Sequence, residues 1–502
     1  MKGYRYLLTS LLLCTSTFYG ADAPAEQKAD SAAVSSSNAS YDGNALLLTG
    51  HVLLDHGLGK LAADEAKLQK QEVGKEFPFS LIQLMNHVKL SMKTGAQIQC
   101  DGADLDFTSL KGQLTALEGN KVVYSDALKK GLFRLLGNSV DLKIAKREDQ
   151  DKKASFDIET ILAKDEVSIE FAGDFSLQAH QALYRKMPTK EGSSQEFQGI
   201  VTAYPKDAEN PCRLVHGDDL VLAESVDLDI VNSKLTLLHP KGSVTSHTGA
   251  NGKKGAIKFT CDHLLWDHLK NTLTLKGHVN VLESLFGRLT SDGDLEIVQT
   301  QQKQNRVLKS IRATGVTEVD FKDENETSHH LRGYGPFTFD RQQLRATLES
   351  PKRKPGKDGK GGGVPLDKQV HYEMQSKTSG LSLFANHAQM EYTPSQGNLR
   401  PSVLTLTGNI RLFSMDEKKP RYALADRLTL SNTTRTIILS AAPGRKVLFM
   451  DKSQTMKIAA QEVHITRDSK TGEERVQGIG NVQFAFSDEE SKLMKKLFPA
   501  NE

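Results

Sequence analysis

Apolar and polar residues alternate along most of this chain with a period of two. In the runs 46–54, 273–281 and 404–412, Leu, Val or Ile occupies every second position around a central glycine. Successive side chains of a β-strand point to opposite faces, so this period indicates strands with one buried face. The pattern predicts an all-β protein built from antiparallel strands.

A glycine followed by His or Asn interrupts several of these predicted strands. The step occurs at Gly50-His51, Gly119-Asn120, Gly277-His278, Gly408-Asn409 and Gly480-Asn481, with a weaker version at Asn86-His87. Glycine adopts positive φ without steric cost, and a β-bulge bends a strand and increases its twist. We therefore expect a bulge or a bend at each of these steps.

A second pattern, eight residues long, places a small residue between apolar positions and recurs along the chain. The small residues are Ala63, Cys100, Gly137, Ala179, Gly217, Cys261, Ser291, Gly333, Ala385, Ala425 and Ala460. Their mean spacing is about 40 residues, which lies in the range of repeat architectures. Each repeat is interpreted as two strands joined by a turn, with the small residues at equivalent places.

The ends of the chain and its Pro- and Gly-rich segments suggest the remaining organisation. Residues 351–369 contain a Gly-Gly-Gly run, three prolines and several lysines, which is typical of a linker loop. In the last segment, Ser487 and Glu490 form a capping box ahead of a one-sided apolar stripe. The predicted organisation is a signal peptide at 1–23, a flexible leader at 24–40, β repeats at 41–205, 206–350 and 370–486, the linker at 351–369, and a short helix at 487–502.

The first residues resemble a secretory signal peptide. Lys2 and Arg5 precede the apolar run 7–19, and Ala21 and Ala23 supply an A-x-A cleavage pattern. The run is shorter than the roughly 20 residues that a membrane-spanning helix needs. We expect an exported protein.

Composition narrows the classes of partner. Lys and Arg number 65 and Asp and Glu number 62, a balance that argues against a nucleic-acid partner held by phosphate contacts. One tryptophan in 502 residues leaves few stacking platforms for bases or sugars. Beyond the leader there are three cysteines, Cys100, Cys212 and Cys261, so burial rather than a disulfide framework must stabilise the fold. The sequence does not decide whether two of the three form a disulfide.

Signatures of common enzymes are absent from the sequence. No G-x-S-x-G, H-E-x-x-H or G-x-x-x-x-G-K-[ST] motif occurs. Cys261, His263 and His268 lie close together, but Cys261 occupies the small-residue column and no second ligand shell accompanies it. The prediction is a non-enzymatic protein without a metal or another cofactor.

The best-preserved repeats resemble those of the OstA family. Leu46-x-Leu48-x-Gly50-His51-Val52, followed by Leu61-x-Ala63-Asp64-x-Ala66-x-Leu68, is similar to the repeat of that family, which includes LptA, LptC and the N-terminal domain of LptD. Residues 404–430 and 273–297 are similar to it as well. The resemblance implies an elongated antiparallel β jelly roll, also called a β-taco, that takes up the acyl chains of lipopolysaccharide on their way to the outer membrane. It implies partners of the Lpt type that join through strand edges. Together with the signal peptide, it implies a location in the periplasm, with an association with the outer membrane as a further expectation.

Lipid-binding positions are expected on the inward rows of these repeats. A roll lined with Leu, Val and Ile offers a non-directional interior that tolerates acyl chains of different length. The candidates are Leu48, Val52, Leu54, Val88, Leu90, Val279, Val281, Leu406 and Ile410. From the residues alone a closed core is favoured, because an apolar row in a strand usually serves packing, and the family resemblance favours the groove. Two alternative functions stay open, a structural envelope scaffold that joins partners by strand edges and a carbohydrate-active β-solenoid enzyme.

Overall fold

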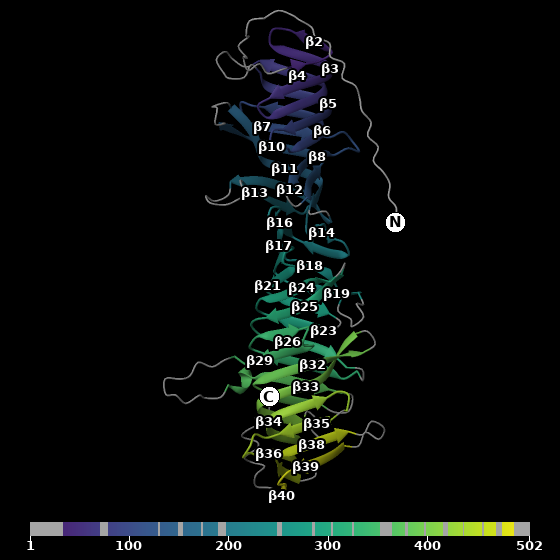
Figure 1. Cartoon of the computed structure of the whole chain (residues 1–502), viewed down its shortest axis with the longest axis vertical. Helices are drawn as coiled ribbons and strands as arrows, with labels where there is room; N and C mark the ends of the chain where they lie inside the picture. Colours follow the sequence, from purple (N-terminus) through teal and green to yellow (C-terminus); the bar gives the residue numbers. More distant parts are fainter. Residues whose placement is uncertain are drawn as a thin grey trace, which may run out of the picture.

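The protein is an elongated all-β molecule, as predicted from the alternation. In the computed structural model, the described residues form one antiparallel sheet of forty strands, stacked along the long axis from the N-terminal to the C-terminal end (Figure 1). The structure describes residues 34–485 apart from gaps at 71–78, 129–130, 149–153, 172–173, 189–196, 248–253, 284–286, 303–304, 324–325, 352–363, 377–379, 396–397, 415–419, 435, 454–455 and 468–473. Within that part, helical structure is limited to the 3₁₀ turn Leu366–Lys368.

The sheet folds into two facing layers. Eight long strands contribute to both: β3 (Ala45–His56), β4 (Gly59–Lys70), β5 (Phe79–Met92), β6 (Gln97–Asp106), β11 (Ala154–Phe171), β12 (Phe175–Pro188), β33 (Asn398–Ser414) and β34 (Arg421–Ser431). Layer 1 also contains β2 (Asn38–Tyr41), β7 (Lys111–Thr115), β10 (Ser139–Glu148), β13 (Phe197–Tyr204), β16 (Ser225–Asp229), β17 (Lys234–Leu238), β20 (His263–Asp267), β21 (Thr272–Lys276), β24 (Leu295–Gln302), β25 (Asn305–Ala313), β28 (Phe337–Asp340), β29 (Arg345–Glu349), β32 (His387–Ser395), β35 (Thr436–Ser440), β38 (Glu462–Arg467) and β39 (Glu474–Ile479). Layer 2 also contains β1 (Val34–Ser35), β8 (Val122–Leu128), β9 (Gly131–Gly137), β14 (Cys212–His216), β15 (Asp219–Ala223), β18 (Lys241–His247), β19 (Lys254–Thr260), β22 (Val279–Glu283), β23 (Gly287–Ser291), β26 (Thr317–Lys322), β27 (Ser328–Gly333), β30 (Val370–Gln375), β31 (Gly380–Ala385), β36 (Val447–Asp451), β37 (Met456–Ala460) and β40 (Gln483–Ala485).

The chain alternates between hairpins of the two layers. After the hairpin β16–β17 in layer 1 it makes β18–β19 in layer 2, then β20–β21 in layer 1. Each hairpin pairs with the preceding one of its own layer, as β17 does with β20 and β19 with β22. This pairing continues across the predicted repeat boundaries near 205 and 350, through β13–β16 and β29–β32. The three predicted repeat blocks are therefore parts of one continuous sheet.

All crossings between the layers lie on one edge, which we call the seam. The predicted Gly-His and Gly-Asn steps stand there: φ is +78° at Gly50 and +51° at His51, +68° at Gly277 and +42° at His278. In β3 and β33 the step is a bulge at which the register shifts. Two consecutive left-handed residues turn the strand sharply, so one strand can serve both layers.

The small-residue column also lies at the seam, with one exception. Nine of its members pair with an apolar or β-branched residue of the neighbouring strand in layer 2, as Ala63 does with Val52, Ser291 with Val279 and Ala460 with Val447. Cys261 follows the last residue of β19, and its N–H donates to the carbonyl of Pro240 at 3.3 Å. Gly217 is the exception, because it occupies the turn between β14 and β15 at the opposite edge, and the register positions of that rung belong to Cys212 and Ala223. The assignment of Gly217 to the column was wrong.

Aspartates that follow the small residues explain the polar position of the repeat. The carboxylate of Asp101 accepts the backbone N–H of Leu117 at 2.7 Å, and that of Asp292 accepts the N–H of Val316 at 2.6 Å. The Leu117 N–H is the main cause of the lowered pKa of Asp101. These aspartates satisfy backbone donors where the chain leaves the ladder and no strand partner is present.

Of the predictions for the ends of the chain, the structure corrects the one for the flexible leader, and the others lie outside the described residues. Val34–Ser35 and Asn38–Tyr41 form β1 and β2 against the two halves of β3, so part of the segment predicted as a flexible leader belongs to the sheet. Ladder hydrogen bonds to β3 outweigh the Ser- and Asn-rich composition of this stretch. The predicted signal peptide, most of the linker and the helix at 487–502 lie outside the described residues.

The seam geometry predicts the effect of Gly277→Ala. The new Cβ would lie 2.2 Å from Oδ2 of Asp262, at a φ that L-residues rarely adopt. We expect a loss of about 2 kcal/mol in local stability, measured by hydrogen exchange of the β20–β22 amides.

Gly119→Ala is the matched control, because Gly119 has a φ of +87° and no atom within 4 Å of the added Cβ. It should show the backbone strain alone, about 1 kcal/mol. Equal losses in the two variants would mean that contact with Asp262 contributes nothing.

Candidate functional site

The nine predicted lipid-groove residues all face the space between the layers. Each is at most 5% exposed and belongs to the single apolar core of the described residues. Leu48 and Leu406 stand in the layer 1 halves of β3 and β33, and the other seven stand in layer 2. The inward orientation expected from the period is observed for all nine, and their contact with lipid stays a prediction.

The interior is closely packed rather than hollow around Gly333, Gly199 and the fully buried leucines. A Cβ added to Gly333 of layer 2 would lie 2.5 Å from Cγ of Leu348 in layer 1. A Cβ added to Gly199 would lie 2.6 Å from Cδ1 of Ile230. Leu90, Ile98 and Leu406 have no exposed surface. In this structure the apolar rows of the two layers cover each other.

The edge opposite the seam has a different construction. It is formed by the hairpin turns of both layers, and we call it the mouth. No strand crosses it in the described residues; the layers meet there through contacts between residues distant in sequence. Nε2 of Gln299 in layer 1 donates to the carbonyl of Thr245 in layer 2 at 3.0 Å, and the Phe156 N–H donates to the Gly57 carbonyl at 3.2 Å.

The central contact of the mouth is a buried ion pair. Nη1 of Arg306 in β25 donates to Oδ2 of Asp219 in β15 at 2.6 Å, and the Asp219 side chain is 1% exposed. The Asp219 carboxylate also accepts the Thr245 N–H at 2.7 Å and lies 3.3 Å from Nδ1 of His216. Burial raises the pKa of Asp219, but hydrogen bonds from His216, Arg306 and Thr245 outweigh it and hold the pKa below its usual range.

Three further basic side chains face acidic side chains of the other layer along the mouth. Lys186 of layer 1 lies 3.1 Å from Asp157 and faces the charge of Asp126 in layer 2. In the C-terminal third, Arg421 of layer 2 binds Asp451 at 3.0 Å and contacts Glu474 of layer 1.

Between these pairs, Arg341 of layer 1 faces the charge of Glu283, a layer 2 residue that is 2% exposed. We refer to the four cross-layer groups, centred on Lys186, Arg306, Arg341 and Arg421, as the clasps. Ion pairs removed from water are strong when both partners are satisfied, and breaking one partner out of such a pair is costly.

Near the N-terminal end the mouth is closed by rings instead. His56 at the end of β3 stacks on Phe156 with ring centroids 5.5 Å apart, and its ring centroid lies 4.1 Å from that of Phe107. Burial lowers the pKa of His56 to about 4, so this ring is neutral at physiological pH. A neutral ring adds apolar closure without a charge.

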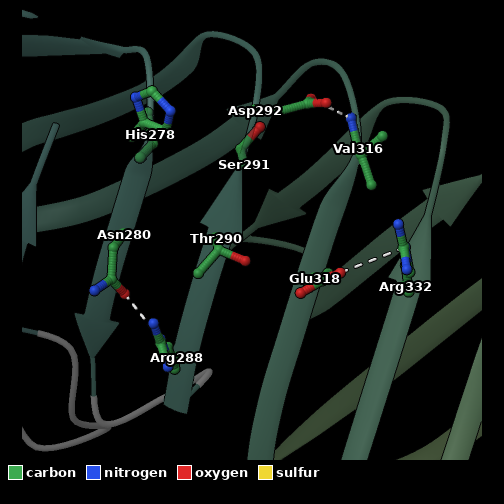
Figure 2. Close-up of a pocket in the computed structure, with 10 residues that line it drawn as sticks. His278, Asn280, Arg288, Thr290, Ser291, Asp292, Val316, Glu318 and Arg332 are labelled. Atoms are coloured by element: carbon green, nitrogen blue, oxygen red, sulfur yellow. Dashed lines mark hydrogen bonds and ion pairs between the residues drawn. The ribbon is translucent and has the colours of Figure 1, made fainter. Parts of the chain in front are cut away.

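A polar pocket of about 420 Å³ lies on the outer face of layer 2, next to the seam. Figure 2 shows its side chains paired with one another: Arg288 Nε donates to Asn280 Oδ1 at 3.1 Å, and Arg332 lies 3.4 Å from Glu318. Asn280 stands on β22 between Val279 and Val281, on the opposite face of that strand. The pocket is therefore separated from the interior by the sheet itself.

The chemistry-bearing residues weighed from sequence do not assemble into a reactive centre. Cys100, Cys212 and Cys261 are free and buried, and burial raises the pKa of each thiol to about 12. Cys261 lies 3.2 Å from the carbonyl oxygen of His263. Among the described residues, no three His, Cys, Asp or Glu side chains are grouped to hold a metal ion.

The sequence reasoning missed the clasps. Asp219 and Arg306 are separated by 87 positions, and neither belongs to a recognisable motif. The available signal was a charged residue at an inward position of an alternating strand, as Asp219 is in the sequence DLVLA.

Comparison with known proteins adds no relative. No model of a known protein family matches the chain, and no curated protein sequence matches it. The OstA resemblance therefore depends on the repeat residues alone.

The central clasp predicts a pH-dependent effect of Asp219→Asn. At neutral pH we expect a loss of about 3 kcal/mol, because Arg306 is left buried without its carboxylate. The folded pKa of Asp219 is lowered, so its contribution is complete above the unfolded pKa near 4 and declines as pH falls through the folded pKa. The difference between parent and variant, measured by chemical denaturation, should stay level from pH 7 to 5 and shrink below about pH 4.

Asp294→Asn provides the control. Asp294 lies 3.0 Å from Lys276 in a pair whose side chains are about half exposed. This variant should lose less than about 1 kcal/mol. A loss at Asp219 no larger than that at Asp294 would contradict a stabilising clasp.

Proposed function

We propose that this protein binds the acyl chains of lipopolysaccharide between its two layers and conveys the lipid toward the outer membrane without enzymatic activity. The observation that supports this proposal is the construction of the interior, where one apolar core runs along the described sheet. At the seam the backbone itself crosses between the layers, whereas in the described part of the mouth only side chains and single hydrogen bonds hold the layers together. Such a body admits an elongated apolar ligand by parting at one edge. It agrees with the OstA-like jelly roll suggested by the repeats.

The free energies of burying an acyl chain and of opening a clasp favour binding between the layers. Burying one methylene contributes about 0.8 kcal/mol, so a chain of fourteen carbons contributes on the order of 10 kcal/mol before ordering costs. Leaving one charge of a buried pair without its partner costs about 3–5 kcal/mol, and separating a clasp costs less than that, because water hydrates both charges when the mouth opens. An acyl chain can therefore offset the opening of one clasp and the local repacking beside it.

The length of the molecule suits transport across an aqueous space. With twenty-four strands in each layer at about 4.8 Å per strand, the sheet extends about 110 Å. We propose a periplasmic location because residues 1–23 resemble a signal peptide. In the described residues, no helix is long and apolar enough to cross a membrane. The nine inward residues named above are the proposed lipid contacts.

The close packing of the interior favours a second candidate, a structural scaffold. In that case the layers stay closed, and partners such as Lpt-type proteins add strands to the terminal edges, β1 and β2 at one end and β39 and β40 at the other. The scaffold predicts no lipid uptake at all.

Val279→Thr distinguishes the two functions. Val279 is 2% exposed and pairs with Ser291, so a hydroxyl of similar volume changes polarity with little change in shape. We expect binding of lipopolysaccharide, followed by native mass spectrometry, to fall several-fold, while stability falls by about 1–2 kcal/mol. Val279→Asp should abolish binding if the variant still folds, which its thermal unfolding will show.

Asn280→Thr is the matched control on the outer face of the same strand, and it should leave both lipid binding and melting near the parent. A folded Val279→Thr variant that binds like the parent would remove Val279 from the site. Absence of lipid from the parent protein itself would refute transport and favour the scaffold.

A further inference from the structure

The central clasp stands out because rings surround it. His216 stacks on Phe175 with centroids 3.9 Å apart, and His268 meets the Phe175 ring edge-on at 4.8 Å. Trp266 of layer 1 lies 5.4 Å from Phe175 and 5.8 Å from His216, both of layer 2. These four rings extend from the apolar core to the surface at the mouth.

Arg306 connects this ring cluster to the clasp. Its Nη1 lies 3.3 Å from Nδ1 of His216 as well as 2.6 Å from Asp219. Nε2 of His216 lies 2.8 Å from Asp174, whose side chain is 58% exposed. The cluster therefore places one guanidinium and two imidazoles beside three carboxylates, those of Asp219, Asp174 and Asp267, of which only Asp174 is largely in water.

In each of the other three clasps, a single basic side chain faces one or two carboxylates. Lys186 faces two carboxylates, Asp126 and Asp157, and Arg421 binds two, Asp451 and Glu474. Arg341 faces the single charge of Glu283. The central clasp combines a guanidinium with two imidazoles, so it offers a phosphate several nitrogen donors in one place.

Ring composition points to the same place. Trp and His side chains combine an apolar body with a polar N–H, and such residues suit the boundary between hydrocarbon and water. Trp266 and Phe175 are each 2% exposed and adjoin the apolar interior, whereas His268 and Arg306 lie nearer to solvent. A lipid placed here would set its first methylenes on the buried rings and its head group on the basic side chains.

We propose that the central clasp is the entrance for lipid and a binding site for an anionic, phosphate-bearing head group. The proposal rests on the lipid-binding function above. The phosphate replaces Asp219 as the partner of Arg306, with His216 and His268 as further donors. Asp219 keeps the N–H of Thr245, and the layers part at β15 and β25 while the seam stays intact.

The single tryptophan makes this proposal directly testable. Trp266 is the only tryptophan of the chain, so its fluorescence reports on the entrance alone. Monomeric phosphatidic acid with brominated acyl chains should quench Trp266, and phosphatidylcholine with the same chains should need at least a tenfold higher concentration. Inorganic phosphate should compete with phosphatidic acid without quenching, which separates recognition of the phosphate from capture of the lipid.

Variants assign the effect to Arg306. Arg306→Gln should remove the preference for the phosphomonoester, and Arg306→Lys should retain part of it, with thermal unfolding confirming that both fold. Arg288→Gln on the outer face should behave like the parent. Equal quenching by the two lipids, or an unchanged preference in Arg306→Gln, would overturn the head-group site.

The same titration separates failure of this proposal from failure of the proposed function. Lipid bound according to native mass spectrometry but without quenching of Trp266 would place the entrance elsewhere and leave lipid binding standing. No bound lipid by either method would refute both. Quenching with the expected preference, lost in Arg306→Gln, would support the entrance.

Discussion

Mutual coverage of the two layers is the constraint on which this structure depends. A two-stranded hairpin cannot bury its apolar row alone, so every hairpin needs an opposing one of the other layer. The chain meets this need by changing layer after each hairpin or within a long strand. Each crossing requires a sharp turn in limited space, and the left-handed pairs at Gly277-His278 and Gly408-Asn409 supply it. The small-residue column and the seam aspartates follow from the same demand, because they fill and satisfy the crossing.

Period and spacing made most of this predictable. Alternation identified strands, and the Gly-His step located the bends, because both depend on residues within one or two positions of each other. Gly217 was misassigned because a turn and a seam both favour a small residue before an acidic one, and only the ladder distinguishes them. The clasps could not be predicted from the sequence, because the pairing of Asp219 with Arg306 depends on how four intervening hairpins stack. β1 and β2 were missed because β3, rather than their own composition, makes them strands.

The two edges of the molecule differ in kind, and that difference carries the functional argument. Opening the seam would break the ladder at each crossing, where Gly50 and His51 are held in strained conformations by neighbouring turns. Opening the mouth would break side-chain pairs and single hydrogen bonds while leaving every strand in its ladder. Close packing of the interior is therefore compatible with the proposed lipid uptake, provided that the layers separate locally.

Local separation is plausible because the array is quasi-one-dimensional. Each rung contacts its neighbours in the stack and the opposite layer, so opening around Arg306 need not disturb Arg421 or the rings at His56. The energetic demand is then set by one clasp and a few inward residues, whereas the gain grows with the length of chain that enters. An apolar chain that lies along the axis would gain contact rung by rung and lose it in the same increments. Stepwise exchange of this kind suits movement along the interior better than tight retention at one place.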